Sequence, residues 1–465
     1  MPGEENLRES ENRNGAWSLA DQGAVSLGNF LTTVLLARAL PREEYGIFVL
    51  IYGLLVLLNS FHSSAVAYPL SIQGATSDHK GLHKHARSAL SFTAVLLLPF
   101  GAAVFGACNL LGRPWVTLPA IAALLCWQTQ ETMRRSLMAH LRHADALWGD
   151  SLSYLGQAAI LFFFLKRGTV SLELVFSVIA ATSLLAAILQ AYQVRLEIKY
   201  DLDSFVYSGN SWELSRWAVL ANTAVVLPSL TFPWIMALHG ARETASYQAL
   251  LNLVGITNPI LLGISNIAVP AVMLANVRGG FHAASRVLLR YGAYGATLIF
   301  PCFVAMAIWP EAVLRVFYGA ASPYLSEVLG LRLLVGGYAI SFACFLFATF
   351  FYGVGQSKSV MKAQWTGAVV GVIAGFPLVL ELGIRGAAIG LGFVYLAQAT
   401  AFLVLMRRSA ISPDSWRSSA PVPTVPLRAA NELSSFKSED GGGERFAHRS
   451  LAEPVVVITK GDSGE

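Results

Sequence analysis

Apolar stretches, each about as long as a membrane span, recur through most of the 465-residue chain. A helix needs about 20 apolar residues to cross a bilayer. Backbone groups find no water partners inside lipid, and these stretches lack the alternating pattern of a membrane barrel, so helices are predicted. The predicted spans lie at about 16–39, 45–70, 88–110, 116–138, 144–165, 171–194, 214–238, 244–275, 287–309, 328–352, 360–380 and 386–406.

The composition supports an all-α integral membrane protein. Only 13% of the residues are charged, against about 25% in a soluble domain, and the mean hydropathy is positive. Residues 1–15 are polar, with mixed charge, and do not have the pattern of a cleavable signal peptide. The first apolar stretch is therefore expected to remain in the mature protein as a span.

The positions of basic residues predict how the chain crosses the membrane. With a cytoplasmic N-terminus, the inner loops carry more Lys and Arg than the outer ones, and both termini lie inside. The Lys166–Arg167 pair is an exception, because this scheme places it outside. The predicted organisation is a cytoplasmic N-terminal segment at 1–15, an N-lobe at 16–194, a linker at 195–213, a C-lobe at 214–408, and a disordered cytoplasmic tail rich in Ser, Pro and Gly at 409–465.

The sequence contains an internal repeat with an offset of 200 residues. The offset aligns Trp17 with Trp217 and the pair Arg42–Glu43 with Arg242–Glu243, without gaps. Both copies start on the same side of the membrane, so the repeat is parallel. We therefore expect two lobes of six helices each, about twelve in all, related by pseudo-symmetry around a cavity.

Polar residues in the apolar stretches are candidates for the cavity lining. Gln22, Ser26, Asn29 and Thr33 follow one face of the first helix, and Asn222 stands at the position equivalent to Gln22. Two interpretations remain open for Gln22, Asn29 and Asn222: they line a cavity, or they make hydrogen bonds between helices.

Charged residues within or beside spans form a second set of candidates. Asp21 lies one turn past Trp17. It either reaches water at the inner face or caps a neighbour, or it has a cavity or proton-linked role as a water-accessible acid. Glu131 stands four residues before Arg135, in the favourable order for an ion pair. Arg134 and Arg135 end this helix on the predicted inner side, where the preference for basic residues on the cytoplasmic side alone also explains them. Together with Arg134 and Arg135, a ring of charge near the inner leaflet is expected to include Asp150 in the fifth helix and Glu213 and Arg216 at the start of the seventh. Such a ring suits an anionic headgroup.

Other classes of function lack support in the sequence. The basic residues sit at the ends of apolar stretches and form no nucleic-acid-binding face. The four cysteines lie singly in apolar surroundings, without the spacing of a zinc site. Because no nucleotide-binding or hydrolase motif is found, we expect no enzymatic activity, no catalytic residue, no metal and no cofactor.

Three stretches resemble a known family: DQGAVSLGNFLTTVLLARALPREEYGIF, RRSLMAHLRHADALWGDSLSYL and YGVGQSKSVMKAQWTGAVVGVIAGFPLVLELGIRGAAIG. They are similar to the polysaccharide-flippase branch of the multidrug, oligosaccharidyl-lipid and polysaccharide exporter superfamily. The resemblance implies two six-helix bundles in a V shape and alternating access. It also implies movement of a polyprenyl-diphosphate-linked oligosaccharide across a bacterial inner membrane, for lipopolysaccharide or exopolysaccharide synthesis. Arg134, Arg135 and Arg216 match the arginines expected in such a cavity only near its inner end.

Two alternatives stay open from the sequence. One is a cation-coupled multidrug exporter of the same superfamily, in which Asp21 or Glu131 is the coupling acid. The other is a membrane scaffold for polysaccharide synthesis. The expected partners are a lipid-linked oligosaccharide, membrane lipids, and glycosyltransferases or a polymerase of the same pathway, with no nucleic acid.

Overall fold

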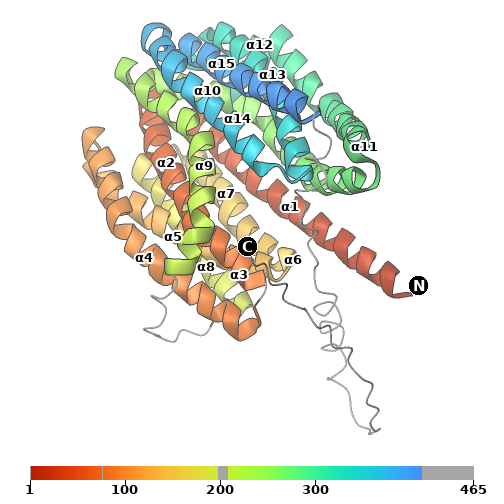
Figure 1. The fold of residues 1–465 in the computed structure, drawn as a ribbon. Helices are drawn as coiled ribbons and strands as arrows, with labels where there is room; N and C mark the ends of the chain where they lie inside the picture. Colours follow the sequence, from red (N-terminus) through yellow and green to blue (C-terminus); the bar gives the residue numbers. More distant parts are fainter. Residues whose placement is uncertain (1, 76, 197–207, 411–465) are drawn as a thin grey trace, which may run out of the picture. The chain divides into compact units, whose positions relative to one another are not determined.

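The computed structural model describes residues 2–75, 77–196 and 208–410, and every element in these ranges is a helix (Figure 1). The first repeat contains α1 (Pro2–Ala39), α2 (Arg42–His62), η1 (Ser63–Ala67), α3 (Tyr68–Ala75), α4 (His79–Leu110), η2 (Pro114–Val116), α5 (Thr117–Ala139), α6 (His143–Asp150), η3 (Ser151–Leu155), α7 (Gly156–Arg167) and α8 (Leu172–Val194). The second contains α9 (Ser208–Met236), η5 (Ala237–His239), α10 (Ala241–Val254), η6 (Gly255–Thr257), α11 (Asn258–Ile308), α12 (Pro310–Tyr318), η7 (Pro323–Ser326), α13 (Val328–Gly353), α14 (Ser357–Val370), η8 (Gly371–Gly375) and α15 (Phe376–Ala410).

Within the described residues, six helical ranges are long and apolar enough to cross a membrane, which confirms the all-α membrane fold. The longest, Ala241–Ile308, has 68 residues and would measure about 100 Å as a straight helix, against a hydrocarbon core of about 30 Å. It is therefore long enough to cross more than once, as is the 52-residue range Ser357–Arg408. The number of twelve crossings stays a prediction.

Both long ranges fold back on themselves at glycines. Gly280 has φ 64° and Gly383 has φ 54°, a left-handed conformation that favours glycine. On either side of the first break, a Cβ added to Gly295 would come within 2.6 Å of the Ile264 side chain, so the two arms are in contact. These breaks separate the predicted spans 244–275 from 287–309 and 360–380 from 386–406.

Loops that the sequence assigns to one side of the membrane meet one another. Among the predicted inner loops, Arg142 donates to the Gln193 carbonyl at 2.9 Å, and His83 Nε2 lies 3.0 Å from the Val194 carbonyl. Among the predicted outer loops, Arg113 pairs with Glu44 at 2.5 Å. These three contacts agree with the predicted sides of the segments they join, and the full topology stays a prediction. Which face is cytoplasmic stays a prediction.

The two repeats touch at equivalent positions. The Nε of Arg42 donates to the carbonyl of Arg242, exactly 200 residues away, at 3.1 Å, and Arg242 pairs with Glu43 at 3.5 Å. A Cβ on Gly46 would overlap the Ala241 carbonyl oxygen, so α2 and α10 approach at backbone contact. Equivalent positions of the repeat detected in the sequence are thus in contact, and we call this region around Arg42 and Arg242 the inter-repeat contact.

Three helices begin at least six residues before their predicted limits, and one of them, α4, begins at His79 instead of residue 88. Helix α1 begins at Pro2 instead of residue 16, since the polar segment contains no helix-breaking residue between Pro2 and Gly15 apart from Gly3 near the helix start. Helix α9 begins at Ser208, six residues before the predicted limit at 214. Residues 197–207 of the predicted linker and 411–465 of the predicted tail lie outside the described residues.

Candidate functional site

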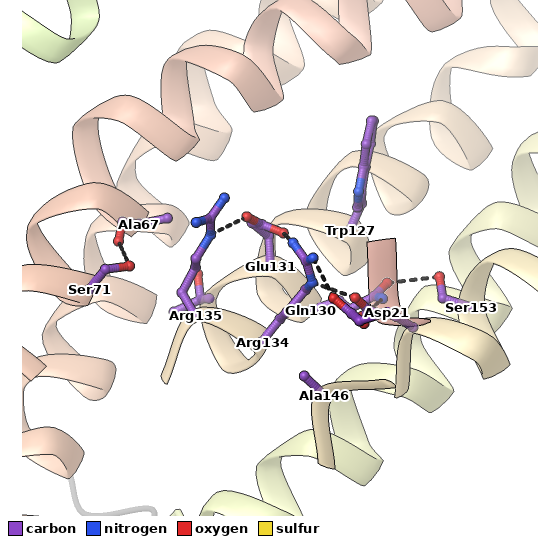
Figure 2. A network of polar contacts seen from close by, with 12 residues as sticks. Asp21, Ala67, Ser71, Trp127, Gln130, Glu131, Arg134, Arg135, Ala146 and Ser153 are labelled. Carbon is purple, nitrogen blue, oxygen red and sulfur yellow. Dashed lines mark hydrogen bonds and ion pairs between the residues drawn. The ribbon is translucent and has the colours of Figure 1, made fainter. Parts of the chain in front are cut away.

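Arg134 on α5 is surrounded by three carboxylates from three elements (Figure 2). Its guanidinium lies 2.9 Å from Asp21 Oδ2 on α1 and 3.3 Å from Glu131 Oε2 on α5, and it pairs with Asp150 Oδ2 at the end of α6. Asp21 is 1% exposed and Asp150 is fully buried. The ion pairs therefore lie inside the first repeat, away from bulk water.

The cluster continues through second partners. Arg135 donates through Nε to Glu131 Oε1 at 2.7 Å, so Glu131 holds one guanidinium with each carboxylate oxygen. The other oxygen of Asp150 accepts from the amides of Gln130 at 3.2 Å and Gln190 at 3.1 Å. We call the five ionisable residues the charge cluster: Asp21, Glu131, Arg134, Arg135 and Asp150.

Helix geometry and close packing bring these side chains together. Glu131, Arg134 and Arg135 are three and four residues apart on α5 and so share a face. Asp150 precedes the π-helical turn η3, a type of distortion that often marks functional sites. Helix α1 approaches this turn closely, because a Cβ added to Gly28 would lie 2.6 Å from the backbone of Tyr154. Asp21, seven residues earlier on α1, thereby reaches Arg134.

The charge cluster has three carboxylates and two guanidinium groups, so its formal charge is −1 when all five are ionised. A buried charge without a partner costs several kcal/mol. In addition, the buried Asp21 Oδ1 makes no hydrogen bond within the described residues. The arrangement can therefore take up one proton, or one small cation, and become neutral.

The structure separates the sequence-predicted residues into two groups. Asp21, Glu131, Arg134, Arg135 and Asp150 come together, and the predicted Glu131–Arg135 pair is present. Asp150 is buried in the first repeat beside Arg134, and no described contact joins Arg216 to the cluster. The ring of charge near the inner leaflet stays a prediction. Arg216 is exposed and lies over the Trp217 ring at 5.5 Å.

The remaining candidates lie outside the charge cluster. Gln22 is half-buried and lies 3.5 Å from Ser26 on the same helix, and Asn29 is also half-buried on α1. Asn222 donates to Ser60 Oγ at 2.6 Å and Ser64 Oγ at 3.0 Å, joining α9 to α2 and η1. For Asn222, the structure thus shows the hydrogen-bonding alternative. In this conformation Asp21 is 1% exposed and pairs with Arg134 in the interior, so it does not reach water here.

Sequence reasoning missed three residues that complete the site. Gln130 and Gln190 hold Asp150, and Ser153 donates to the Gln130 carbonyl oxygen at 2.9 Å. Gln130 stands four residues before Arg134, which is the only local signal of its role. Gln190 is on α8, among apolar residues, and nothing in its neighbourhood in the sequence indicates that it faces Asp150.

A second polar network lies at the inter-repeat contact. Arg42 is 3.5 Å from Glu327 and 3.8 Å from Glu243, and it also bonds the Ser246 hydroxyl. Burial and the neighbouring Glu243 raise the pKa of Glu327, while Arg42 and Arg385 act in the opposite direction. Glu327 is therefore a weaker acid at this contact than a glutamate in water. The network holds the two repeats together at this end.

Comparison with solved structures shows the fold. The chain is similar to the lipid II flippase MurJ in an inward closed conformation, with a TM-score of 0.68, 12% identity, and coverage of 84% of this chain and 87% of that one. It is similar to an outward-facing multidrug resistance MATE transporter of the MOP superfamily, with a TM-score of 0.62, 13% identity, and coverage of 86% and 96%. The chain is also similar to a MOP superfamily transporter from Pyrococcus furiosus, with a TM-score of 0.63, 12% identity, and coverage of 88% of this chain and 96% of that one.

No protein-family model and no curated protein matches the sequence. At identities of 12–13%, the structural likeness establishes the fold and leaves the substrate open. The apolar helices and this likeness agree with the prediction from sequence at the level of fold. The chain is a multi-pass helical membrane protein with a fold similar to that of MOP superfamily transporters.

Proposed function

We propose that the chain is a flippase that moves a polyprenyl-diphosphate-linked oligosaccharide across the bacterial inner membrane by alternating access. The similarity to a lipid II flippase supports a lipid-linked substrate. The closed inter-repeat contact, at the predicted outer side, is what an inward-facing state of such a cycle requires. The product would serve synthesis of a surface or extracellular polysaccharide.

The single observation that supports an anionic substrate is the environment of Arg135. Its side chain is 38% exposed, whereas that of Arg134 is 13% exposed. Within the described residues, only the Nε of Arg135 has a hydrogen-bond partner, and Glu131 holds it at 2.7 Å. The two terminal nitrogens are left to bind a phosphate oxygen pair in the forked geometry of arginine.

The charge cluster supplies a means of coupling in this proposal. Arg135 shares Glu131 with Arg134, and Arg134 in turn holds Asp21 and Asp150. A diphosphate that draws Arg135 away from Glu131 leaves the remaining cluster with more negative charge. Uptake of one proton or monovalent cation by the cluster then returns its formal charge to −1, so substrate and ion binding are linked.

The test is flipping by the reconstituted full chain in vesicles, with a polyprenyl-diphosphate-linked disaccharide as the probe. Arg135→Gln should reduce the initial flipping rate about tenfold or more, because charged hydrogen bonds contribute about 1.5–3 kcal/mol. Arg135→Lys should recover part of the rate, because it keeps the charge and loses the fork. Flipping by Arg135→Gln at the wild-type rate would remove Arg135 from substrate binding.

Arg142 provides a matched control for this experiment. Its side chain is also 38% exposed, and it pairs with Asp145 three residues later at 2.6 Å. It differs because its guanidinium also holds the Gln193 carbonyl at a loop. Arg142→Gln should therefore flip the probe at close to the wild-type rate, provided that the protein is equally abundant.

A cation-coupled multidrug exporter is the second candidate, and the excess carboxylate in the charge cluster favours it. Such an exporter has to release a cation from a buried acid. Asp21 is a buried acid within a helix of the first repeat, paired with Arg134. The two proposals are distinguished in the same vesicles by replacing the lipid-linked probe with an apolar cationic dye. Dye transport driven by an imposed proton or sodium gradient, without flipping of the lipid, would favour the exporter.

A further inference from the structure

The second repeat carries a groove between α14 and α15, which lie side by side (Figure 1). The groove has a volume of about 630 Å³. Most of its lining is apolar, with several small side chains that leave the hollow, and no acidic residue contributes to it. It is lined by Lys362, Thr366, Val370, Ala374, Phe393, Leu396, Ala397, Thr400, Ala401, Val404 and Leu405.

Both hydroxyl groups of the groove wall donate to carbonyl oxygens of their own helices. Thr366 donates its hydroxyl to the Lys362 carbonyl at 2.9 Å, and Thr400 donates to the Leu396 carbonyl at 2.8 Å. Neither hydroxyl hydrogen is left for a ligand. The wall therefore offers an apolar surface to whatever fills it, and lipid chains are the apolar molecules available beside a membrane span.

The groove has the length of one membrane leaflet. From Lys362 to Ala374 there are twelve helical steps, which correspond to about 18 Å at about 1.5 Å per residue. Half of the hydrocarbon core is about 15 Å. An acyl chain that enters from the end marked by Lys362 can thus run the full length of the groove without crossing the bilayer centre.

One end of the groove is basic. Lys362 lines it, Lys358 stands one turn earlier on α14, and Arg408 stands one turn beyond Val404 on α15. All three cations are exposed, and no described acidic residue forms an ion pair with any of them. In the predicted topology this end is cytoplasmic. An anionic headgroup above the groove would meet all three, whereas a neutral headgroup gains nothing from them.

We propose that this groove binds one acidic phospholipid of the surrounding membrane, with its chain between α14 and α15 and its phosphate at Lys358, Lys362 and Arg408. The observations favour it over the polyprenyl chain of a transported substrate, because α14 and α15 pack against α9, α10 and α13 of their own repeat, whereas the charge cluster lies in the other repeat. The proposal holds whatever substrate is transported.

The experiment titrates delipidated full-length protein with phosphatidylglycerol and follows bound lipid by native mass spectrometry. Wild type should retain one phosphatidylglycerol more tightly than phosphatidylcholine. Each basic residue near an anionic lipid contributes about fivefold, so Lys362→Gln/Arg408→Gln should weaken the first binding step roughly twentyfold. Lys80→Gln/Lys84→Gln is the control, because it removes two predicted inner-face cations remote in sequence from the groove and should leave binding unchanged.

A second variant tests the apolar part independently of charge. Ala397→Phe places a large side chain in the groove and should reduce the binding of phosphatidylglycerol while leaving all three cations in place. Three results would overturn the proposal: equal retention of the two phospholipids, unchanged binding by both groove variants, or displacement of phosphatidylglycerol by equimolar polyprenyl phosphate. The last would identify the occupant as the chain of a polyprenyl lipid.

Discussion

Arg134 holds three carboxylates, so its replacement should cost far more than the loss of a surface arginine. Removal of one partner from a buried ion pair destabilises a protein by about 3–5 kcal/mol, because the other charge stays buried. We expect Arg134→Gln to lower the thermal unfolding temperature of the detergent-purified protein. Addition of Asp21→Asn should recover part of the loss, since one of the uncompensated carboxylates is then absent.

Arg142→Gln is the control for this prediction as well. Arg142 pairs with Asp145 at the surface, where such pairs contribute at most about 1 kcal/mol. Two results would contradict the account of the cluster: a similar loss of stability for Arg134→Gln and Arg142→Gln, or an additive loss when Asp21→Asn is combined with Arg134→Gln.

At the residue scale, the sequence predicts local pairs and misses partners from other helices. Glu131 and Arg135 are four residues apart on one helix, so their pairing requires only that α5 forms. Arg134 is adjacent in sequence to Arg135 and has a different environment, because Asp21 and Asp150 are supplied by α1 and α6. Burial of a charge depends on which helices pack together, and the one-dimensional pattern does not contain that information.

Close helix packing at Gly28 is needed to place Asp21, which gives a prediction at the scale of the element. Gly28→Ala would bring a methyl group to within 2.6 Å of the Tyr154 backbone, which cannot yield as a flexible side chain does. We expect a loss of about 1–3 kcal/mol, the usual range for overpacking, and a separation of α1 from η3. Thermal unfolding and the flipping assay would measure both effects.

Gly23 offers the matched control on the same helix. A Cβ added to Gly23 meets nothing within 4 Å, and alanine favours the helix over glycine by about 1 kcal/mol. Gly23→Ala should therefore be neutral or stabilising. If both variants unfold at the same temperature, the approach of α1 to η3 does not depend on the absence of a side chain at Gly28.

The helices themselves were largely predictable, because their existence follows from length and hydropathy. The breaks at Gly280 and Gly383 fall between pairs of predicted spans. The π-helical turns at η1, η3 and η8 were not predicted, since their hydrogen-bond register leaves no clear mark in the residue pattern. The early start of α1 was not predicted, because hydropathy identifies only the part of a helix that lies in the membrane. Residues 2–15 are polar and form a helix outside it.

At the scale of the whole molecule, the repeat in the sequence anticipates the contact between the repeats. Positions 42 and 242 are equivalent by the 200-residue offset, and in the structure they touch. In the predicted pseudo-symmetry, equivalent positions meet only where they lie beside the axis that relates the two repeats. The sequence identified the pairs, but it could not indicate that the contact is closed, because that is a property of one conformation.

Alternating access requires the inter-repeat contact to open during each cycle, which leads to the last prediction. In a background where Cys108, Cys126, Cys302 and Cys344 are replaced by serine or alanine, Glu43→Cys/Arg242→Cys places two thiols across the contact. Both native side chains are exposed, so a short cleavable bifunctional thiol reagent can reach the positions. Cross-linking should stop flipping, and cleavage of the linker should restore it.

Glu44→Cys/Arg113→Cys controls for modification of this face, because that native ion pair joins two elements of the first repeat at 2.5 Å. A linker between α2 and the segment before η2 ties parts that move together, so flipping should continue after complete cross-linking. The decisive comparison is between the two pairs at equal extents of cross-linking, measured by the shift in electrophoretic mobility after proteolysis between the paired positions. Undiminished flipping by the fully linked 43–242 pair would mean that the repeats do not separate here, and that transport proceeds with the inter-repeat contact closed.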